Sequence, residues 1–251
     1  MTYIGTKDPA IERAIAQILG TYGDTVSVEA KNKSLLVFGR NEDVGTSPET
    51  VWLNGGDETL PTGNDIDIVV STSGSDTGTV QIEGHTLSGS DLTFVTQTAT
   101  LNGITNVPLS TPLYRVSKLT NTGSADFVGV VTVEDNGTSV NLTTGSAGVN
   151  LSQKCATSLS SQDYYIVTGV SVGVDKTQTR SVTFEFQIKP FGGVWLTVVQ
   201  FETNSASGSV SQYGIPYFIV PKNSDFRMRA TSSGTATVCS AWINGHLAII
   251  V

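Results

Sequence analysis

The chain has 251 residues, of which only 14% are charged, and its formal net charge is −8 with a pI near 4.7. This acidic balance argues against nucleic-acid binding, which requires clustered Lys and Arg. No stretch reaches the apolar length needed to cross a bilayer, so we expect no membrane partner. A neutral surface rich in Gly, Ser, Thr and Asn is typical of proteins that pack side by side.

The first predicted element is a helix over residues 8–19. Asp8 can cap it, Pro9 suits its first turn, and Gly20 ends it. A helix this short is marginal in water by itself, so its apolar stripe must bury against a partner or the rest of the chain. We therefore predict that Ile11, Ile15 and Ile18 of this helix bind a partner. Its apolar residues recur at helical spacing: Ile11, Ala14, Ile15, Ile18 and Leu19.

From residue 25 onward the pattern changes to short runs of alternating apolar and polar residues. Asn102-Gly103 and Asn136-Gly137 between these runs predict tight turns. Short strands separated by turns favour a sandwich or barrel over a sheet with crossover helices. The predicted strands are 26–28, 35–38, 66–70, 79–83, 92–101, 114–116 and 128–133.

A stretch rich in Gly, Ser and Thr, residues 137–148, suggests a boundary, and further strands follow. Pro216 and Pro221 bracket one of them and predict an edge strand, because Pro cannot donate to a sheet ladder. The apolar end of the chain should be tucked into a sheet or buried against a partner. Its predicted partner-binding residues are Leu247, Ile249 and Val251. The strands are 164–174, 181–188, 194–201, 215–220, 226–230 and 235–251.

These elements predict an all-β protein with a short N-terminal helical segment followed by two β-sandwich or jelly-roll-like domains. We place an N-terminal attachment segment at residues 1–60, one sandwich at 61–140 and the other at 141–251.

The sequence offers little catalytic chemistry. His85 and His246 are the only histidines, and we expect His85 in a solvated turn and His246 in a hairpin turn. Two separated histidines cannot form a three-ligand zinc site, and no Ser lies in a Gly-x-Ser-x-Gly elbow. We therefore predict no catalytic, cofactor-binding or metal-binding residues and no enzymatic activity. We expect Cys155 and Cys239 to be buried free thiols, with a disulfide as the alternative.

Two further chemistries stay open. Paired carboxylates could hydrolyse glycosides or hold calcium, although each pair lies at a turn, where acidic residues favour solvent. Exposed tryptophans could stack on a sugar, although core packing is expected for those in apolar runs. The carboxylate pairs are Asp57 with Glu58, Asp65 with Asp67 and Glu134 with Asp135, and the tryptophans are Trp52, Trp195 and Trp242.

Two segments carry a family resemblance. Residues 66–135 contain GTVQIEG, TLNG and YRV in that order, and residues 215–230 read IPYFIVPKNSDFRMRA. These segments resemble structural proteins of tailed phages, particularly those of marine bacteria. The motifs are strand-and-turn patterns, and the family pattern supplies no catalytic residues to carry over.

The resemblance implies a virion component without enzymatic activity. The first expectation is a capsid decoration or cement protein, bound in many copies to the major capsid protein or other virion proteins. We also expect it to form a homo-oligomer. Residues 1–19 lack the features of a secretory signal, which fits assembly in the host cytoplasm. A tail or adaptor component, a glycan-binding host-recognition module and a hydrolase are the alternatives.

Overall fold

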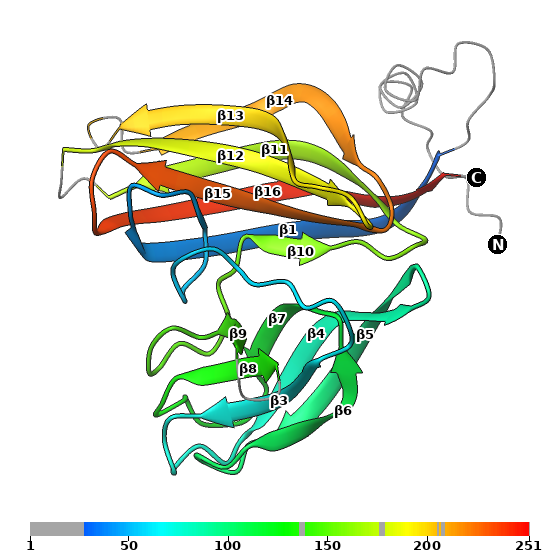
Figure 1. The fold of residues 1–251 in the computed structure, drawn as a ribbon, viewed down its shortest axis with the longest axis vertical. Coiled ribbons are helices and arrows are strands. Elements are labelled where there is room, and N and C mark those ends of the chain that lie inside the picture. The colour runs from blue at the N-terminus through cyan, green and yellow to red at the C-terminus, as the bar shows by residue number, and fades with distance from the viewer. Residues whose placement is uncertain (1–27, 136–138, 176–178, 205, 207–208, 251) are drawn as a thin grey trace.

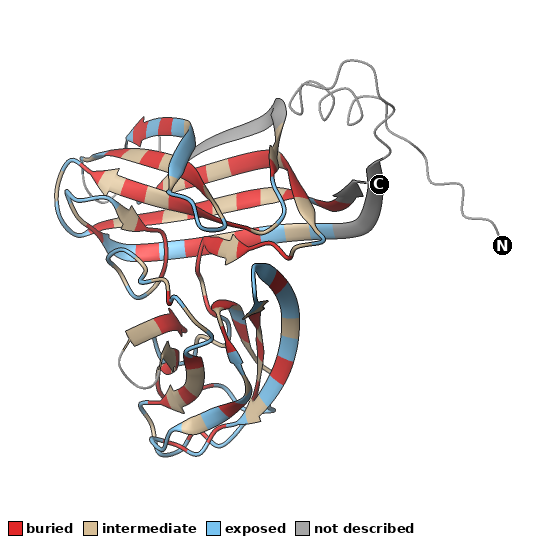
Figure 2. Ribbon diagram, turned by 45° about the vertical axis from the view of Figure 1, so that its right-hand side comes forward, coloured by how far each residue is buried: buried red, intermediate tan, exposed pale blue. Residues whose placement is uncertain are grey.

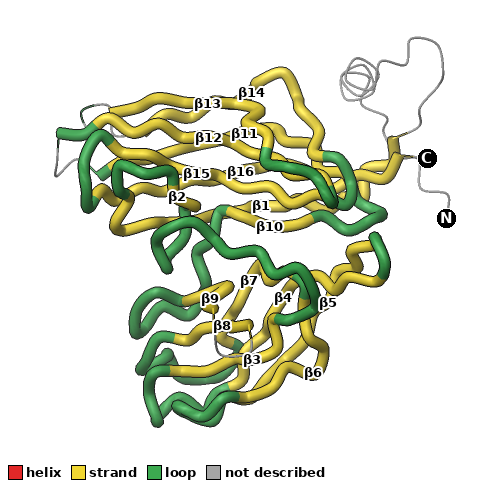
Figure 3. The backbone as a smooth tube through the Cα atoms, in the orientation of Figure 1, coloured by secondary structure: helices red, strands yellow, loops and turns green. Residues whose placement is uncertain are grey.

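The computed structural model describes residues 28–135, 139–175, 179–204, 206 and 209–250, and these fold into two stacked β lobes (Figure 1). The predicted all-β class is confirmed, since the described residues contain strands and loops but no helix (Figure 3). The helix predicted at residues 8–19 lies outside the described residues.

The larger lobe is a sandwich of two antiparallel sheets. One sheet has the order β1-β16-β11-β14 and the other β10-β15-β12-β13, with short β2 paired to β15. Counted along the chain without β2, these eight strands run 1-8-3-6 and 2-7-4-5, which is the order of a jelly roll. The strands are β1 (Val28–Val44), β2 (Glu49–Thr50), β10 (Ala156–Ser158), β11 (Tyr164–Val174), β12 (Ser181–Pro190), β13 (Leu196–Asn204), β14 (Ser209–Val220), β15 (Ser224–Ser232) and β16 (Thr237–Ile250).

The smaller lobe is inserted between β2 and β10. It stacks a sheet of order β6-β3-β8-β9 on a sheet of order β5-β4-β7. The Asn102-Gly103 turn lies between β5 and β6, where Gly103 has a φ of 59°, and it carries the chain from one sheet to the other. The strands are β3 (Ile66–Ser71), β4 (Thr79–Ser88), β5 (Asp91–Thr100), β6 (Val107–Leu113), β7 (Arg115–Asn121), β8 (Val131–Asp135) and β9 (Ser139–Thr143).

The lobes divide the chain differently from the predicted boundaries at residues 60 and 140. β1 and β2, which the sequence analysis grouped with the attachment segment, belong to the jelly roll because β1 pairs with β16 from Val28↔Ile250 to Val44↔Thr237. β9 belongs to the inserted lobe, where it pairs with β8. Local patterns show strands but not their partners, so a discontinuous lobe reads as two separate segments.

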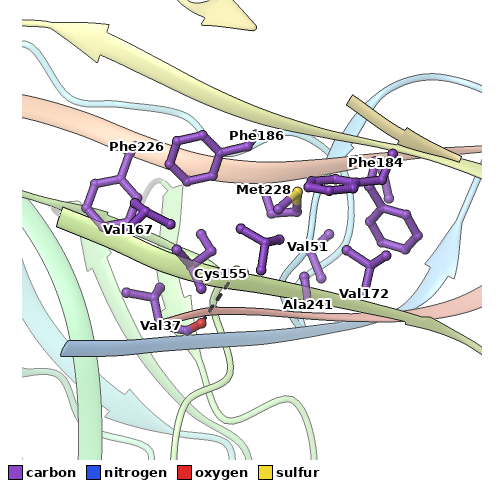
Figure 4. Close-up of a cluster of buried hydrophobic side chains, with 14 of the residues drawn as sticks. Val37, Val51, Cys155, Val167, Val172, Phe184, Phe186, Phe226, Met228 and Ala241 are labelled. Atoms are coloured by element: carbon purple, nitrogen blue, oxygen red, sulfur yellow. Dashed lines mark hydrogen bonds between the residues drawn. The ribbon is translucent and has the colours of Figure 1, made fainter. Parts of the chain in front are cut away.

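Alternating side chains build the jelly-roll core. Phe184 and Phe186 of β12 point inward and are fully buried, while Glu185 between them is half-buried. Buried and less buried residues alternate along the jelly-roll strands (Figure 2). Phe226 stacks on Tyr165 from the opposite sheet with ring centroids 5.2 Å apart, and Figure 4 shows Phe184, Phe186 and Phe226 gathered in this core. Burying side chains of this size stabilises the fold by about 2 kcal/mol each.

Both cysteines are free and buried in this core, as predicted. The Cys155 thiol donates a long hydrogen bond of 3.7 Å to the Val37 carbonyl, which Figure 4 marks. Burial raises the pKa of the Cys239 thiol to about 12 and raises that of Cys155 as well. Both thiols therefore stay protonated and unreactive in the folded protein.

Two other local predictions have opposite outcomes. The edge strand predicted between Pro216 and Pro221 is confirmed, because β14 lies at the end of its sheet. The hairpin turn predicted at His246 is wrong. β16 runs unbroken through Asn244-Gly245, and Gly245 is there because a Cβ would lie 2.1 Å from the Ile166 carbonyl oxygen of neighbouring β11.

Candidate functional site

A cleft of about 580 Å³ opens where the two lobes meet, within the range of ligand sites. β1, β10 and β16 contribute to it from the jelly roll, and β4, β5 and β7 from the inserted lobe. Its lining residues are Leu35, Leu36, Val37, Phe38, Glu83, His85, Phe94, Ser117, Lys118, Leu151, Ser152, Lys154, Thr157, Ser158, Leu159, Ser160, Asp163 and Leu247.

Three large apolar side chains in this cleft remain open to water. Leu36 is 60% exposed, Phe94 41% and Leu151 40%, and they come from β1, β5 and the segment before β10. The described residues include nine exposed large apolar side chains, and three of these nine line this one cleft. Such a gathering marks an interaction surface, whereas scattered exposed apolar residues need no explanation.

Both lysines of the cleft are already paired with carboxylates. Lys118 Nζ lies 3.7 Å from a Glu83 carboxylate oxygen, and Lys154 Nζ lies 2.6 Å from a carboxylate oxygen of Glu58. Both members of the second pair are almost completely buried. The cleft therefore offers a ligand apolar contact rather than a free charge.

A buried ion pair beside the cleft joins the two lobes. Arg115 on β7 donates to Asp225 on β15 through Nε at 3.2 Å and through Nη2 at 3.2 Å. Ser158 on β10 donates to the same carboxylate at 2.5 Å, and Arg115 Nη1 donates to the Pro61 carbonyl at 2.7 Å. Backbone contacts add to the lobe interface, since Ser161 N–H donates to the Leu92 carbonyl at 2.9 Å.

This pair links the two resemblance segments, because Arg115 lies in YRV and Asp225 in NSDFRMRA. As strand-and-turn patterns the two segments give no reason to pair these charges. β7 and β15 carry other charged and polar residues, so no local pattern singles out Arg115 and Asp225, although a buried charge needs a partner.

The prediction that His85 is a solvated turn residue is wrong. It lies within β4, is only 3% exposed, and packs edge-on against Phe94 with ring centroids 5.4 Å apart. Burial lowers the pKa of His85 to about 4, a shift that Arg115 reinforces and that Asp225 and Asp163 oppose. Its Nδ1 is buried without a hydrogen-bond partner, and the ring is neutral at pH 7.

The first carboxylate pair lies in a structural network rather than free in solvent. Asp57 accepts hydrogen bonds from Thr50 Oγ1 at 2.9 Å and from Arg227 Nη1 at 2.8 Å, and its second oxygen lies 3.2 Å from Arg229. Together with the Lys154–Glu58 pair, these contacts fasten the loop after β2 to β15 and β10.

Asp65 and Asp67 lie close to Asp135, whose pKa is raised first by burial and then by the two neighbouring carboxylates. Across the described ranges, no group of three or more His, Cys, Asp or Glu side chains could hold a metal ion. The same residues contain no helix long and apolar enough to cross a membrane.

None of the three tryptophans presents a bare platform. Trp52 is 2% exposed and donates to the Gly56 carbonyl at 3.0 Å. Trp242 packs against Phe38 at 4.9 Å between ring centroids, and the guanidinium of Arg227 lies 4.0 Å above the ring of Trp195.

A second apolar surface follows the free edge of the jelly roll. Val194 is 72% exposed, Leu196 53% and Val198 44%, at alternate positions leading into and along the edge strand β13. We name these three residues the β13 strip. The strand predicted at residues 194–201 is present as β13, but of its large apolar residues only Phe201 is buried in the core, with Val199 packed alongside.

The predicted partner-binding residues fall in different places. Leu247 is 8% exposed, belongs to the jelly-roll core and also lines the cleft. Ile249 is held in the backbone ladder opposite Glu29. Val251 and the stripe residues Ile11, Ile15 and Ile18 lie outside the described residues.

No protein-family model matches the chain, and no curated protein matches it. Among solved structures it is similar to the VP2 subviral particle of infectious bursal disease virus, with 12% identity, a TM-score of 0.22, and coverage of 98% of this chain and 78% of that chain. The Gt strain structure of the same virus gives 12% identity, a TM-score of 0.20, and coverage of 97% and 78%. These scores are too low to assign this chain the fold or the role of those proteins.

Proposed function

We propose that this protein is a non-enzymatic structural component of a tailed-phage virion, and specifically a decoration protein that binds the capsid surface in many copies. The observation that carries the proposal is the jelly-roll strand order, which recurs in viral capsid and lectin domains. Fold alone does not assign function, so the proposal also draws on the surface.

The β13 strip supplies that surface. Natural edge strands are usually blocked by Lys, Pro or a covering loop, because an open edge invites pairing with another chain. β13 carries Glu202 but neither Lys nor Pro, and it exposes Leu196 and Val198. An exposed apolar strip of this kind suits a contact repeated over many identical capsid subunits, where weak contacts gain from multivalency. The resemblance of the YRV and NSDFRMRA segments to phage virion proteins points the same way.

The test is to produce particles with Leu196→Lys in place of the wild-type protein. A charge at the centre of the β13 strip should reduce the number of bound copies at least tenfold, measured by quantitative mass spectrometry of purified particles. Ile104→Lys is the matched control, because Ile104 is 69% exposed on a turn of the inserted lobe and should leave the copy number unchanged.

Imaging of the same particles distinguishes the possible locations of the protein on the virion. Density at capsomer junctions supports decoration, density at a single vertex supports the tail or adaptor alternative, and glycan-array binding would support host recognition. Particles lacking the protein should form but lose integrity under heat or osmotic shock. Wild-type virions that contain no copies would overturn the proposal.

A further inference from the structure

We infer that the cleft between the lobes is the receptor for the N-terminal segment, residues 8–19, of a second copy of this chain. The inference rests on the proposed function in one respect, namely that copies lie side by side. The cleft presents Leu36, Phe94 and Leu151 to solvent, and it has no unpaired charge among its Lys and Glu residues.

The sequence of the segment complements this surface. Residues 8–19 place five apolar side chains at i, i+3, i+4, i+7 and i+8, counted from Ile11, and carry only Asp8, Glu12 and Arg13 as charges. An amphipathic segment of this kind lays its apolar face in an apolar groove, with anchors at this spacing. Since the contact is apolar on both sides, salt should weaken it little.

The length of the connection decides between the chain's own segment and that of a neighbour. Eight residues, 20–27, separate Leu19 from the start of β1 at Val28, and they reach about 30 Å when fully extended. Leu36 lies eight residues further along the same strand, about 26 Å from Val28. A flexible linker of this length has a root-mean-square span of only about 17 Å.

Docking into the chain's own cleft would therefore need a nearly extended linker that reverses direction at Val28. Such a linker gives the tethered segment a low effective concentration at the cleft. The segment of an adjacent copy is not bound by this span, because its linker belongs to another chain. Each copy then donates one segment and accepts another, which is a heterologous contact that builds rings or larger arrays.

The experiment mixes two full-length variants, Ile15→Cys as donor and Leu151→Cys as acceptor, under mild oxidation. A disulfide between residues 15 and 151 in this mixture can form only between two chains. Peptide mass spectrometry should find this linkage at least tenfold above that between Ile15→Cys and the control acceptor Val128→Cys, whose site is 60% exposed and does not line the cleft. The native thiols are buried and stay outside the reaction.

Two outcomes would overturn the inference. One is equal linkage to residues 151 and 128. The other is that the double variant Ile15→Cys/Leu151→Cys forms only the intrachain disulfide, even when concentrated, which would assign the cleft to the chain's own segment. The purified protein is used without particles, so these outcomes are independent of the copy-number measurement with Leu196→Lys.

Discussion

His85 shows how one buried residue governs the response of the protein to acid. The ring lies between Arg115 and the carboxylates of Asp225 and Asp163, yet loss of water is the largest influence on it. Folding therefore favours the neutral ring, whereas the unfolded chain takes up a proton at the ordinary pKa near 6.5.

The direction of the pH dependence follows from these two values. Between pH 6.5 and about 4 the unfolded chain binds a proton at His85 that the folded protein does not. The contribution of His85 to the free energy of unfolding is therefore fully present above pH 6.5 and is lost as the pH is lowered through this window. The loss is on the order of 3 kcal/mol.

We predict that His85→Leu removes most of this slope, measured by urea unfolding at pH 7, 6, 5 and 4. The absolute stability of the variant does not matter for the test, because only its change with pH is compared. His246→Leu is the control, since His246 is exposed on β16 and its replacement should leave the slope intact. A slope that persists in His85→Leu would assign the acid sensitivity to another group.

Among the elements, β1 is the strand that belongs both to the jelly-roll core and to the wall of the cleft. It pairs with β16 along almost its whole length, packs Val37 into the core, and presents Leu36 to the cleft. Gly39 lets the segments around Val51 and Cys155 cross it closely, because a Cβ there would lie 2.1 Å from the Val51 carbonyl oxygen and 2.2 Å from the Cys155 nitrogen.

Gly39→Ala should therefore lower the free energy of unfolding by about 2 kcal/mol or more, because backbone atoms must move to admit a single methyl group. Thermal and urea unfolding measure the change. The matched control is Gly74→Ala, where an added Cβ meets nothing within 4 Å and the change should stay within about 0.5 kcal/mol. Equal effects at both positions would mean that the close crossing at Gly39 is not tight in solution.

For the whole molecule, the ion pair of Arg115 and Asp225 ties one lobe to the other. Arg115 is 5% exposed and Asp225 8%, so removal of either partner leaves a buried charge without its counter-ion. Arg115→Met should lower the free energy of unfolding by about 3–5 kcal/mol. Arg40→Met is the control, because the Arg40–Glu42 pair is solvent-exposed and should contribute about 1 kcal/mol or less.

A double variant separates the effect of the unpaired Asp225 charge from the effect of losing the Arg115 side chain. Arg115→Met combined with Asp225→Asn should be more stable than Arg115→Met alone, because the unpaired carboxylate is gone. Limited proteolysis measures whether the connections between the lobes become more accessible in the variants that lose stability. A double variant as unstable as the sum of the single ones would show that the two residues act independently.

Local sequence patterns were enough to predict the strands and which of their faces point inward. Three local features carried these predictions: the alternation at Phe184 and Phe186, the Pro residues around the edge strand, and the cysteines, which pack as small apolar side chains. The period of the side chains and the presence of a backbone donor are properties of a few neighbouring residues. That is why the all-β class and the free thiols could be predicted.

Which strands pair, and which residues are buried between the lobes, depends on the three-dimensional arrangement of the chain. The pairing of β1 with β16, the burial of His85 and the ion pair between Arg115 and Asp225 join residues up to about two hundred positions apart. The exposure of Leu196 on β13 likewise depends on that strand lying at a sheet edge. Local periodicity carries no information on such distant partners, because strand pairing is fixed by how whole faces bury against one another.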